Sequence, residues 1–410
     1  MELKKYLQKD KLLLLSLRGI SVVAKFLFTT LFFRFSEADF GEYSLVAVTI
    51  LLLVYGLGMD FYSFANRELM MPNSDKQKII FNQFLFYGFL YLLLFPVVYV
   101  IFHTLNFNPK YQLIFYLVLI TEHLNYEFYR LLFVFKKPIA ANINLFLRNG
   151  LWVLFATVLL FINKNISIEQ VLKYWFMGDL GALLFSASII FFKKHKIAKS
   201  ELTIDTQWIK KGFLISIPYI LGTISYKTIQ FADRYMIDAF MDKKAVGIYS
   251  FFANMANVMN IVLFTLVISV LYPYLVEGVM ENNRQKFDKY FKKFKKEIYL
   301  YSIAMIFILS LLLPIVLITI HKQEYLKDFY VFFLLALGNF FLNLSFLYHY
   351  IIYAYKKDWW IFYATIFGAI INILLNYLLI PSYGIGGASV ATFVSFMLIL
   401  LVKWRYAKKI

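Results

Sequence analysis

The chain has 410 residues, of which 61% are hydrophobic and 20% aromatic, while 16% are charged and the net charge is +18. A soluble domain is about half apolar and about a quarter charged, so this composition excludes a soluble globular protein and predicts an integral membrane protein. The absence of cysteine excludes disulfides, thiolate catalysis and cysteine-based metal sites.

Twelve apolar stretches are long enough to cross a bilayer, which takes about 20 residues in a helix. The loops between them leave no room for a separate soluble domain. We therefore predict an all-α integral membrane fold with about twelve transmembrane helices. In chain order, the predicted spans cover residues 12–33, 43–64, 79–102, 111–135, 139–162, 168–192, 213–231, 246–272, 298–320, 329–355, 359–380 and 385–404.

Lysine and arginine are distributed unevenly over the predicted loops. When the N-terminus is placed in the cytoplasm, most of the 42 Lys and Arg residues fall in cytoplasmic segments, as the positive-inside rule requires. An odd number of spans would destroy this alternation. The pattern predicts that both termini are cytoplasmic.

Short sequences recur in the two halves of the chain. Phe40-Gly41-Glu42-Tyr43-Ser44 is similar to Val246-Gly247-Ile248-Tyr249-Ser250, and each copy opens a predicted span. Lysine pairs also recur in corresponding loops. We therefore predict two lobes, residues 1–200 with spans one to six and residues 201–410 with spans seven to twelve. An even number of helices in each lobe makes them parallel repeats.

A basic segment precedes the ninth predicted span. Between residues 284 and 297, Phe287, Tyr290, Phe291 and Phe294 recur at helical spacing with lysines between them. This pattern is typical of a basic amphipathic helix that lies on an anionic membrane surface. The alternative is a simple extension of the ninth span.

Several charged side chains lie inside the predicted spans, where charge is costly and usually faces a cavity or a partner. Cations predominate among them, which predicts a cationic substrate cavity suited to an anionic head group such as a diphosphate. The candidate cavity residues are Arg18, Lys25, Arg148, Lys227 and Arg234. Arg18 and Lys25 are seven residues apart and share a helix face, as do Lys227 and Arg234.

Acids and amides in the spans form a second group of candidates. Glu127 and Arg130 are three residues apart on one helix and form either a structural ion pair or part of a site. The candidates for ion coupling or charge pairing are Asp60, Glu122, Glu127, Arg130, Asp179 and Asp233. The later spans carry amides that either hold helices together or contact sugars, namely Asn254, Asn257, Asn339, Asn343, Asn372 and Asn376.

Several catalytic signatures are missing from the sequence. It has no Gly-rich phosphate loop followed by Lys-Ser or Lys-Thr, so an ATPase is not expected. It also has no Asp-x-Asp pair in a soluble loop, and its sequence gives no reason to assign a Ser/His/Asp catalytic triad. Its five histidines lack metal-ligand spacing. We predict a secondary-type transporter rather than an enzyme, with no cofactor, no metal site and no nucleic-acid partner.

Three stretches resemble the multidrug/oligosaccharidyl-lipid/polysaccharide (MOP) exporter superfamily, and within it the polysaccharide transporters of the Wzx O-antigen flippase type. One contains Asp233-Arg234 followed by the Gly247 copy of the repeat and is similar to the family's Asp-Arg and Val-Gly-x-Tyr segment. The second is the Gly41 copy. The third runs from Asn376 to Thr392 and is similar to the family's loop into the last span. The resemblance extends over nearly the whole chain.

The resemblance implies a MATE-like, V-shaped bundle of two six-helix lobes that works by alternating access through a cationic cavity. It implies export of an undecaprenyl-diphosphate-linked oligosaccharide, such as an O-antigen, lipopolysaccharide or capsule unit, across the bacterial inner (cytoplasmic) membrane. Coupling to H⁺ or Na⁺ is implied for the membrane acids. Membrane lipids and other polysaccharide-assembly membrane proteins are the implied partners.

Two alternatives remain open at this point. A cation-coupled drug exporter of the same superfamily would be expected to have a net acidic pathway for cationic compounds. A membrane glycosyltransferase or polymerase would be expected to have a large catalytic loop.

Overall fold

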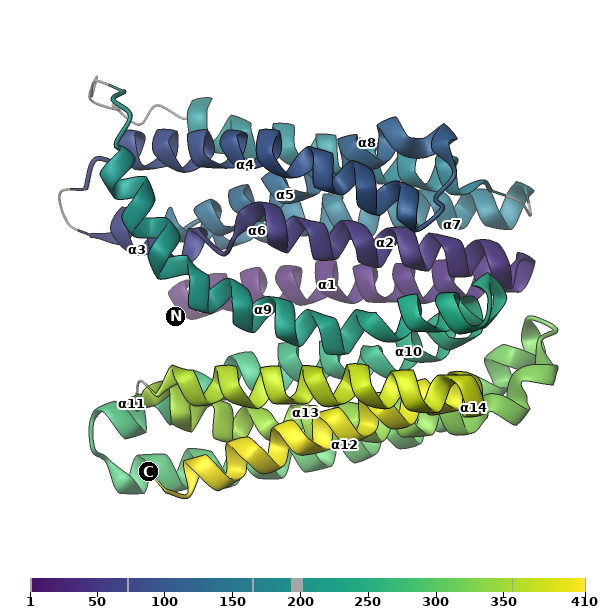
Figure 1. Ribbon diagram of the computed structural model, residues 1–410. Helices are drawn as coiled ribbons and strands as arrows, with labels where there is room; N and C mark the ends of the chain where they lie inside the picture. The colour runs from purple at the N-terminus through teal and green to yellow at the C-terminus, as the bar shows by residue number, and fades with distance from the viewer. Residues whose placement is uncertain (1, 72–73, 164–165, 193–201, 356, 410) are drawn as a thin grey trace. The chain divides into compact units, whose positions relative to one another are not determined.

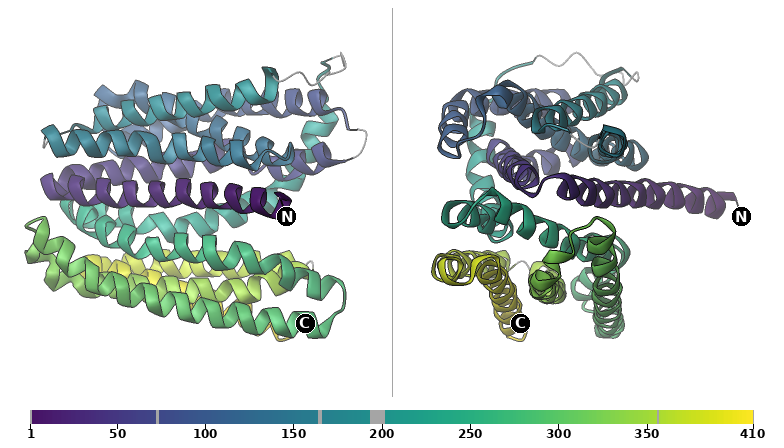
Figure 2. Two further views of the ribbon diagram at one scale, coloured as in Figure 1. Left: turned by 180° about the vertical axis from the view of Figure 1, so that it is seen from behind. Right: turned by 90° about the vertical axis from the view of Figure 1, so that its right-hand side faces the viewer.

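The computed structural model of the protein is all-helical, and most of the long helices of each part of the chain lie along a common direction, whereas α1 (Glu2–Phe35) is inclined to the others of its part (Figure 1, Figure 2). The structure describes residues 2–71, 74–163, 166–192, 202–355 and 357–409, with side chains in these ranges except at residues 2–15, 163, 192 and 358.

Nine of the described helices are long and apolar enough to cross a membrane. Two more, α5 (Gln112–Val134) and α9 (Thr206–Phe240), have the length but carry several polar and charged residues. Helix α14 (Asp358–Ala407) contains two helices, because Gly384 has φ 55° and ψ −137° and redirects the chain. Within the described ranges this makes twelve crossing helices, and the predicted all-α membrane fold is confirmed.

The chain divides into two compact units. Unit 1 comprises Met1–Leu31 and Val46–Ile220, and unit 2 comprises Phe32–Leu45 and Leu221–Ile410. The division therefore runs through α9, whereas the predicted boundary at residue 200 lies outside the described residues.

Unit 1 holds most of the first eight helices and the beginning of α9. Its irregular turns η2 and η3 are π-helical, and η1 is a short 3-10 turn. In chain order the elements are α1 (Glu2–Phe35), α2 (Glu37–Gly58), α3 (Tyr62–Met70), α4 (Lys76–Thr104), η1 (Pro109–Tyr111), α5, α6 (Pro138–Phe146), η2 (Leu147–Leu151), α7 (Trp152–Asn163), α8 (Ile168–Ala187) and η3 (Ser188–Phe192).

The second predicted span is divided between two helices, α2 and α3, by a break in the backbone. Helix α2 ends at Gly58, and Met59 and Asp60 have φ 48° and 49° before α3 begins at Tyr62. Left-handed backbone is uncommon for residues other than glycine and costs about 1–3 kcal/mol for each residue. The second span, predicted over 43–64, therefore ends earlier, at Gly58, because hydropathy does not register the sign of φ.

The start of α9 is fixed to α4 by a polar cluster. Asn82 donates to the carbonyl of Thr203 over 3.0 Å and accepts from the N–H of Asp205 over 2.7 Å. Asp205 caps α9 by accepting from the N–H of Trp208 at 2.9 Å, and it pairs with Lys78 at 3.1 Å. The Trp208 N–H and then the Lys78 ammonium lower the pKa of the Asp205 carboxyl below its ordinary value.

Unit 2 holds the rest of α9 and the helices that follow it. Its turn η4 is π-helical and η5 is a 3-10 turn. In chain order the elements after α9 are α10 (Lys243–Leu263), η4 (Phe264–Ile268), α11 (Ser269–Met280), α12 (Arg284–Thr319), η5 (Gln323–Asp328), α13 (Phe329–Ala354) and α14.

The basic segment before the ninth span is the first part of α12, a 36-residue helix without a break. Phe294 is fully buried, and Phe287, Tyr290 and Phe291 pack against the apolar core of unit 2. The aromatic face is thus covered by protein. The segment is continuous with the ninth span, as the alternative expected, and contact of its basic side with an anionic membrane surface stays a prediction.

The two glycines of the repeated sequence meet each other within unit 2. A Cβ on Gly41 of α2 would lie 1.8 Å from the carbonyl oxygen of Lys243, and a Cβ on Gly247 of α10 would lie 1.9 Å from that of Glu37. Each carbonyl belongs to the residue four positions before the opposite glycine. The two helices therefore cross backbone to backbone, and any side chain at either position would force them apart.

Candidate functional site

Arg148 is placed inside unit 1 by an irregular helix. Pro138 starts α6 at the first helical position, where its missing N–H costs nothing. The helix then widens into the π turn η2, which contains Arg148, before α7 resumes the regular pattern. Trp152 donates to the carbonyl of Arg148 over 2.7 Å, and the Arg148 side chain is 2% exposed. π turns are frequent at functional sites.

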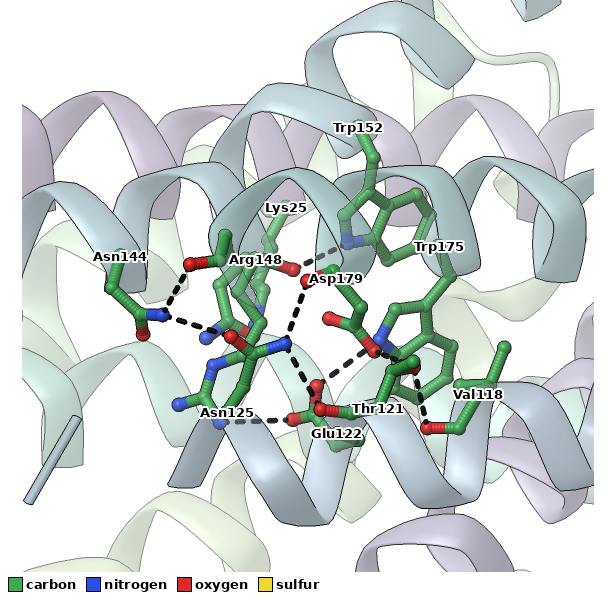
Figure 3. A network of polar contacts seen from close by, with 12 residues as sticks. Lys25, Val118, Thr121, Glu122, Asn125, Asn144, Arg148, Trp152, Trp175 and Asp179 are labelled. Atoms are coloured by element: carbon green, nitrogen blue, oxygen red, sulfur yellow. Dashed lines mark hydrogen bonds and ion pairs between the residues drawn. The ribbon is translucent and has the colours of Figure 1, made fainter. Parts of the chain in front are cut away.

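Two buried acids lie next to Arg148 (Figure 3). Nη1 of Arg148 is 3.4 Å from Oε1 of Glu122 on α5, and the carboxyl of Asp179 on α8 is within hydrogen-bonding reach of Glu122. Trp175 donates to Glu122 over 3.4 Å, and Thr121 donates to Asp179 over 3.2 Å. One guanidinium balances one carboxylate, so the second carboxyl requires a proton or another cation. We call these three residues the Arg148 triad.

Fully buried polar groups hold three helices in register around the Arg148 triad. Asn125 of α5 donates to the carbonyl of Asp179 on α8 over 2.8 Å. Asn144 of α6 donates to Asn125 over 2.8 Å and to Ser186 of α8 over 2.9 Å. Because these groups are neutral, they orient the helices and leave the charge balance to the triad (Figure 3).

Two cations of α1 reach the same irregular helix. Nε of Arg18 donates to Oδ1 of Asn142 over 3.0 Å, and Nζ of Lys25 donates to Oδ1 of Asn149 over 3.1 Å. The two amides have the same seven-residue spacing as the two cations, so α1 runs parallel to α6 and η2 in a fixed register. Lys25 is also within electrostatic range of Glu122. The direct partners are neutral, and these hydrogen bonds therefore leave both positive charges in place.

A second buried cluster lies further along α5. Glu127 accepts from Gln83 and Tyr87 of α4, each over 2.8 Å, and pairs with Arg130. The Arg130 guanidinium lies 3.4 Å from the ring centre of Tyr62 on α3. The ion pair that the sequence spacing allows therefore forms, and its other contacts make it part of the packing of α3, α4 and α5.

Tyr126 connects the two clusters of unit 1. Its ring centre is 4.0 Å from the guanidinium of Arg148 and 5.7 Å from that of Arg130. Asp60, in the left-handed break after α2, is also buried, at 5% exposure. Most of the predicted charged residues of unit 1 thus lie along one side of α5 and its neighbours.

In unit 2, Asp233 and Arg234 of α9 form a network with α10. Asp233 accepts from the hydroxyl of Tyr249 and, over 2.8 Å, from the N–H of Arg234. Arg234 donates to Ser250 over 3.1 Å and to the carbonyl of Gln230 over 2.8 Å. Both charged residues are buried. The Asp-Arg and Gly-x-Tyr-Ser sequences therefore contact each other directly.

Lys227 lies about two turns before Asp233 and Arg234 on α9. Its ammonium donates to Oε1 of Gln230 over 2.9 Å and lies 5.6 Å and 5.4 Å from the ring centres of Tyr226 and Phe231. Gln230 therefore joins Lys227, through its side chain, to Arg234, through its carbonyl.

Four asparagines form a chain of hydrogen bonds between α10 and α13, which we call the amide ladder. Asn260 donates to Asn257 over 3.0 Å and to Asn339 over 2.9 Å, and Asn343 donates to Asn260 over 2.8 Å. Asn343 is buried, while Asn257 at the other end is exposed. The ladder therefore leads from the interior of unit 2 to its surface.

The remaining predicted amides lie apart from the ladder's hydrogen bonds. Asn376 donates to Asn372 over 3.1 Å on α14, and both are fully buried. Asn254 is half-buried on α10.

The structure also identifies residues that the sequence analysis missed. Asn142 and Asn149 hold the two α1 cations, and Asn125 and Asn144 frame the triad. The first pair carries a signal in the sequence, because its spacing equals that of Arg18 and Lys25. Within the described ranges, the structure has no group of three or more His, Asp or Glu placed to hold a metal.

A family model described as "Polysaccharide biosynthesis protein" matches residues 7–279, well over half of the chain. The chain belongs to this family. No curated protein matches it at a significant level. The family match confirms the predicted membership of a polysaccharide biosynthesis family.

Solved structures of MATE transporters share the fold over nearly the whole chain. An inward-facing conformation of a multidrug resistance MATE family transporter of the MOP superfamily aligns with a TM-score of 0.75 and 13% identity, covering 97% of each chain. An outward-facing conformation of such a transporter gives a TM-score of 0.65 and 13% identity, covering 96% of this chain and 95% of the other. The structure of MATE in complex with MaL6 aligns with a TM-score of 0.63 and 14% identity, covering 98% of this chain and 96% of the other.

Identities this low establish the fold and no more. The chain is a multi-pass integral membrane protein with the MATE fold, and it belongs to the polysaccharide biosynthesis protein family.

Proposed function

We propose that this protein exports an undecaprenyl-diphosphate-linked oligosaccharide, a repeat unit of O-antigen, capsule or a related polysaccharide, across the bacterial inner membrane. The family match supports polysaccharide biosynthesis as its setting, and the fold supports transport by alternating access. The observation that carries the proposal is the bonding of Arg18 and Lys25 to the neutral amides of Asn142 and Asn149.

A diphosphate is the anion that suits this arrangement. Seven helical residues separate Arg18 from Lys25 by roughly 10 Å along the axis, and long basic side chains converge readily on a ligand between them. Guanidinium, ammonium and amide groups all donate hydrogen bonds, and charged donors bind phosphate oxygens strongly. The same positive charge argues against export of cationic drugs, which is the principal alternative within the superfamily.

The Arg148 triad supplies a coupling device for such transport. Arg148 of η2 pairs with Glu122, and Lys25 of α1 is within electrostatic range of the same carboxyl. When both carboxyls are ionised, Lys25 helps to neutralise them. When the pair takes up H⁺ or Na⁺, the charge of Lys25 becomes available to the diphosphate, so cation and substrate binding are linked.

Export is tested in cells that lack the transporter and accumulate undecaprenyl-linked repeat units in the cytoplasmic leaflet. Arg18→Gln and Lys25→Gln should fail to relieve this accumulation although each protein reaches the membrane in normal amounts. Lys173→Gln is the matched control, because its side chain is 56% exposed and pairs with Glu169 at 2.6 Å. Wild-type export by both site variants would refute the cationic site.

Coupling is tested with purified protein in vesicles that carry an imposed H⁺ or Na⁺ gradient. The wild type should move the lipid-linked sugar faster when the gradient is present, and Asp179→Asn should remove that response. Asp288→Asn, an exposed acid of α12, should behave as the wild type. Sugar transfer by the purified protein in the same vesicles would instead favour a glycosyltransferase or polymerase.

A further inference from the structure

The extension at the start of α12 has a free basic side. Five of its lysines are exposed, namely Lys289, Lys292, Lys293, Lys295 and Lys296. At about 100° per residue they point away from the aromatic residues that pack on unit 2. The lysine side of the helix is therefore open, while the aromatic side is already occupied by the protein itself.

The lysine side continues directly into the lipid-facing side of the same helix. Steps of three or four residues lead from Lys296 to Leu300, Ile303 and Phe307, which are 59%, 60% and 64% exposed. Residues at this spacing share one face of a helix. An apolar face so exposed on a membrane-crossing helix contacts lipid tails. The lysines lie on the same side of the helix, beyond the ends of the tails.

The length of the exposed apolar run sets the depth of the lysines. It extends from Leu300 to Ile318, which at 1.5 Å per residue is roughly 27 Å, close to the thickness of a bilayer's hydrocarbon core of about 30 Å. Tyr299 and Tyr301 mark one edge, where aromatic residues gather. Lys296 and Lys292 then lie roughly 6 and 12 Å beyond Leu300 along the axis, at and just beyond the level of the lipid headgroups.

Most of these ammonium groups are not neutralised within the described part of the chain. Lys286, on the same extension, bonds to Glu277 and Glu281 at 3.0 Å each. Lys293 approaches Glu297 at 3.7 Å, whereas the ion pairs among the described residues include none from Lys292, Lys295 or Lys296. Positive charge is therefore concentrated where lipid phosphates lie.

We propose that Lys292, Lys293, Lys295 and Lys296 bind the headgroups of anionic phospholipids in the leaflet next to the start of α12. In the predicted topology this is the cytoplasmic leaflet, whose surface is negative and attracts basic segments near a span. The proposal is independent of the exported substrate. It concerns a lipid contact that anchors one end of α12 at a defined depth.

The test uses the full-length purified protein in a neutral detergent, titrated with phosphatidylglycerol or phosphatidylcholine while thermal unfolding is followed. A lipid that binds the folded state raises the midpoint, so phosphatidylglycerol should raise it and phosphatidylcholine should not. The variant with all four lysines changed to Gln should bind phosphatidylglycerol at least about tenfold more weakly. Without lipid its midpoint should equal that of the wild type, because the side chains are exposed.

A control variant carries the same loss of charge elsewhere, with Lys76, Lys210, Lys408 and Lys409 changed to Gln; all four are exposed. It should keep the wild-type response to phosphatidylglycerol. An equal loss in both variants would mean that only total charge matters and would overturn the proposal. So would a wild-type response in the four-lysine variant. If phosphatidylglycerol did not raise the unfolding midpoint of the wild type, the proposal would also be overturned. An acidic protein would then be the expected partner of this face.

Discussion

The fourth span of the first unit and the corresponding tenth span of the second are built from different polar groups. Helix α5 carries the buried acids Glu122 and Glu127, and their partners Arg148 and Arg130 lie within 4 Å of them. Helix α13 has no Asp, Glu, Lys or Arg at all, and its buried polar residues include Asn339 and Asn343. Ionisable groups respond to protons and cations, whereas amides do not. The proposed ion coupling therefore uses the acids of α5 and its neighbours, while the amides of α13 offer neutral hydrogen bonds.

The largest loss of stability is expected when Arg148, the central cation of unit 1, is removed. Arg148→Met should destabilise the protein by about 3–5 kcal/mol, because it leaves a buried carboxylate without its partner. The double variant Glu122→Gln with Arg148→Met should recover much of this loss. Thermal unfolding of the purified variants in detergent measures both effects.

A double variant no more stable than the single one would contradict this account. It would mean that the cost of losing Arg148 comes from its packing against Tyr126 rather than from an uncompensated charge.

Unit 2 should be more sensitive to backbone spacing than to charge. Gly247→Ala places a Cβ 1.9 Å from the carbonyl oxygen of Glu37, so α2 and α10 must separate at a cost of about 1–3 kcal/mol. Gly222→Ala is the control on α9, because its nearest neighbour would be a Phe362 atom at 3.9 Å. The difference in unfolding midpoint between the two variants measures the effect, and equal midpoints would rule out a tight crossing.

Removing one step of the amide ladder should cost less. Asn343→Leu keeps the volume but deletes the hydrogen bond to Asn260, and bonds of this kind in membranes are worth about 0.6 kcal/mol on average and up to about 2. Stability should fall slightly, and the H⁺ or Na⁺ dependence of transport should stay unchanged. A changed ion dependence would place coupling groups in unit 2 as well.

The smallest effect is expected at the start of α9. The pKa of Asp205 is lowered in the folded protein, so its stabilisation is present above the ordinary carboxyl pKa and is lost as pH falls through the folded value. Because the Lys78–Asp205 pair is about one-third exposed, Asp205→Asn should cost no more than about 1 kcal/mol at neutral pH. Unfolding curves of the variant and the wild type should converge in acid; a constant gap at every pH would exclude the ion pair as the cause.

Hydropathy and loop charge predicted the number and order of the crossing helices, because lipid requires long apolar segments whatever the tertiary contacts are. The same reasoning placed the end of the second span six residues too late, because the hydropathy continues past the left-handed turn at Met59 and Asp60. Hydropathy does not register such a turn, and of the two residues only Asp60 is of a type that is enriched in it.

The candidate site was predicted as a set of residue types rather than as an arrangement. Glu127 and Arg130 could be paired from sequence because they share one turn of one helix. Arg148 could not be assigned to Glu122, because the two lie on different helices. The π turn η2 adds a further obstacle, since one extra residue rotates all later positions by about 100° relative to a regular helical wheel.

The crossing of Gly41 and Gly247 has a consequence for how the chain arose. Each glycine lies against the carbonyl four residues before the other, so the contact has the same form from either side. This is the geometry of an isologous interface, in which one surface patch meets its own copy across a two-fold axis. In an ancestral homodimer of a half-length chain, a single glycine would have served both sides of such a crossing. If the two predicted lobes arose by duplication, neither position would tolerate a side chain after the copies separated, which would account for the presence of this short sequence in both halves.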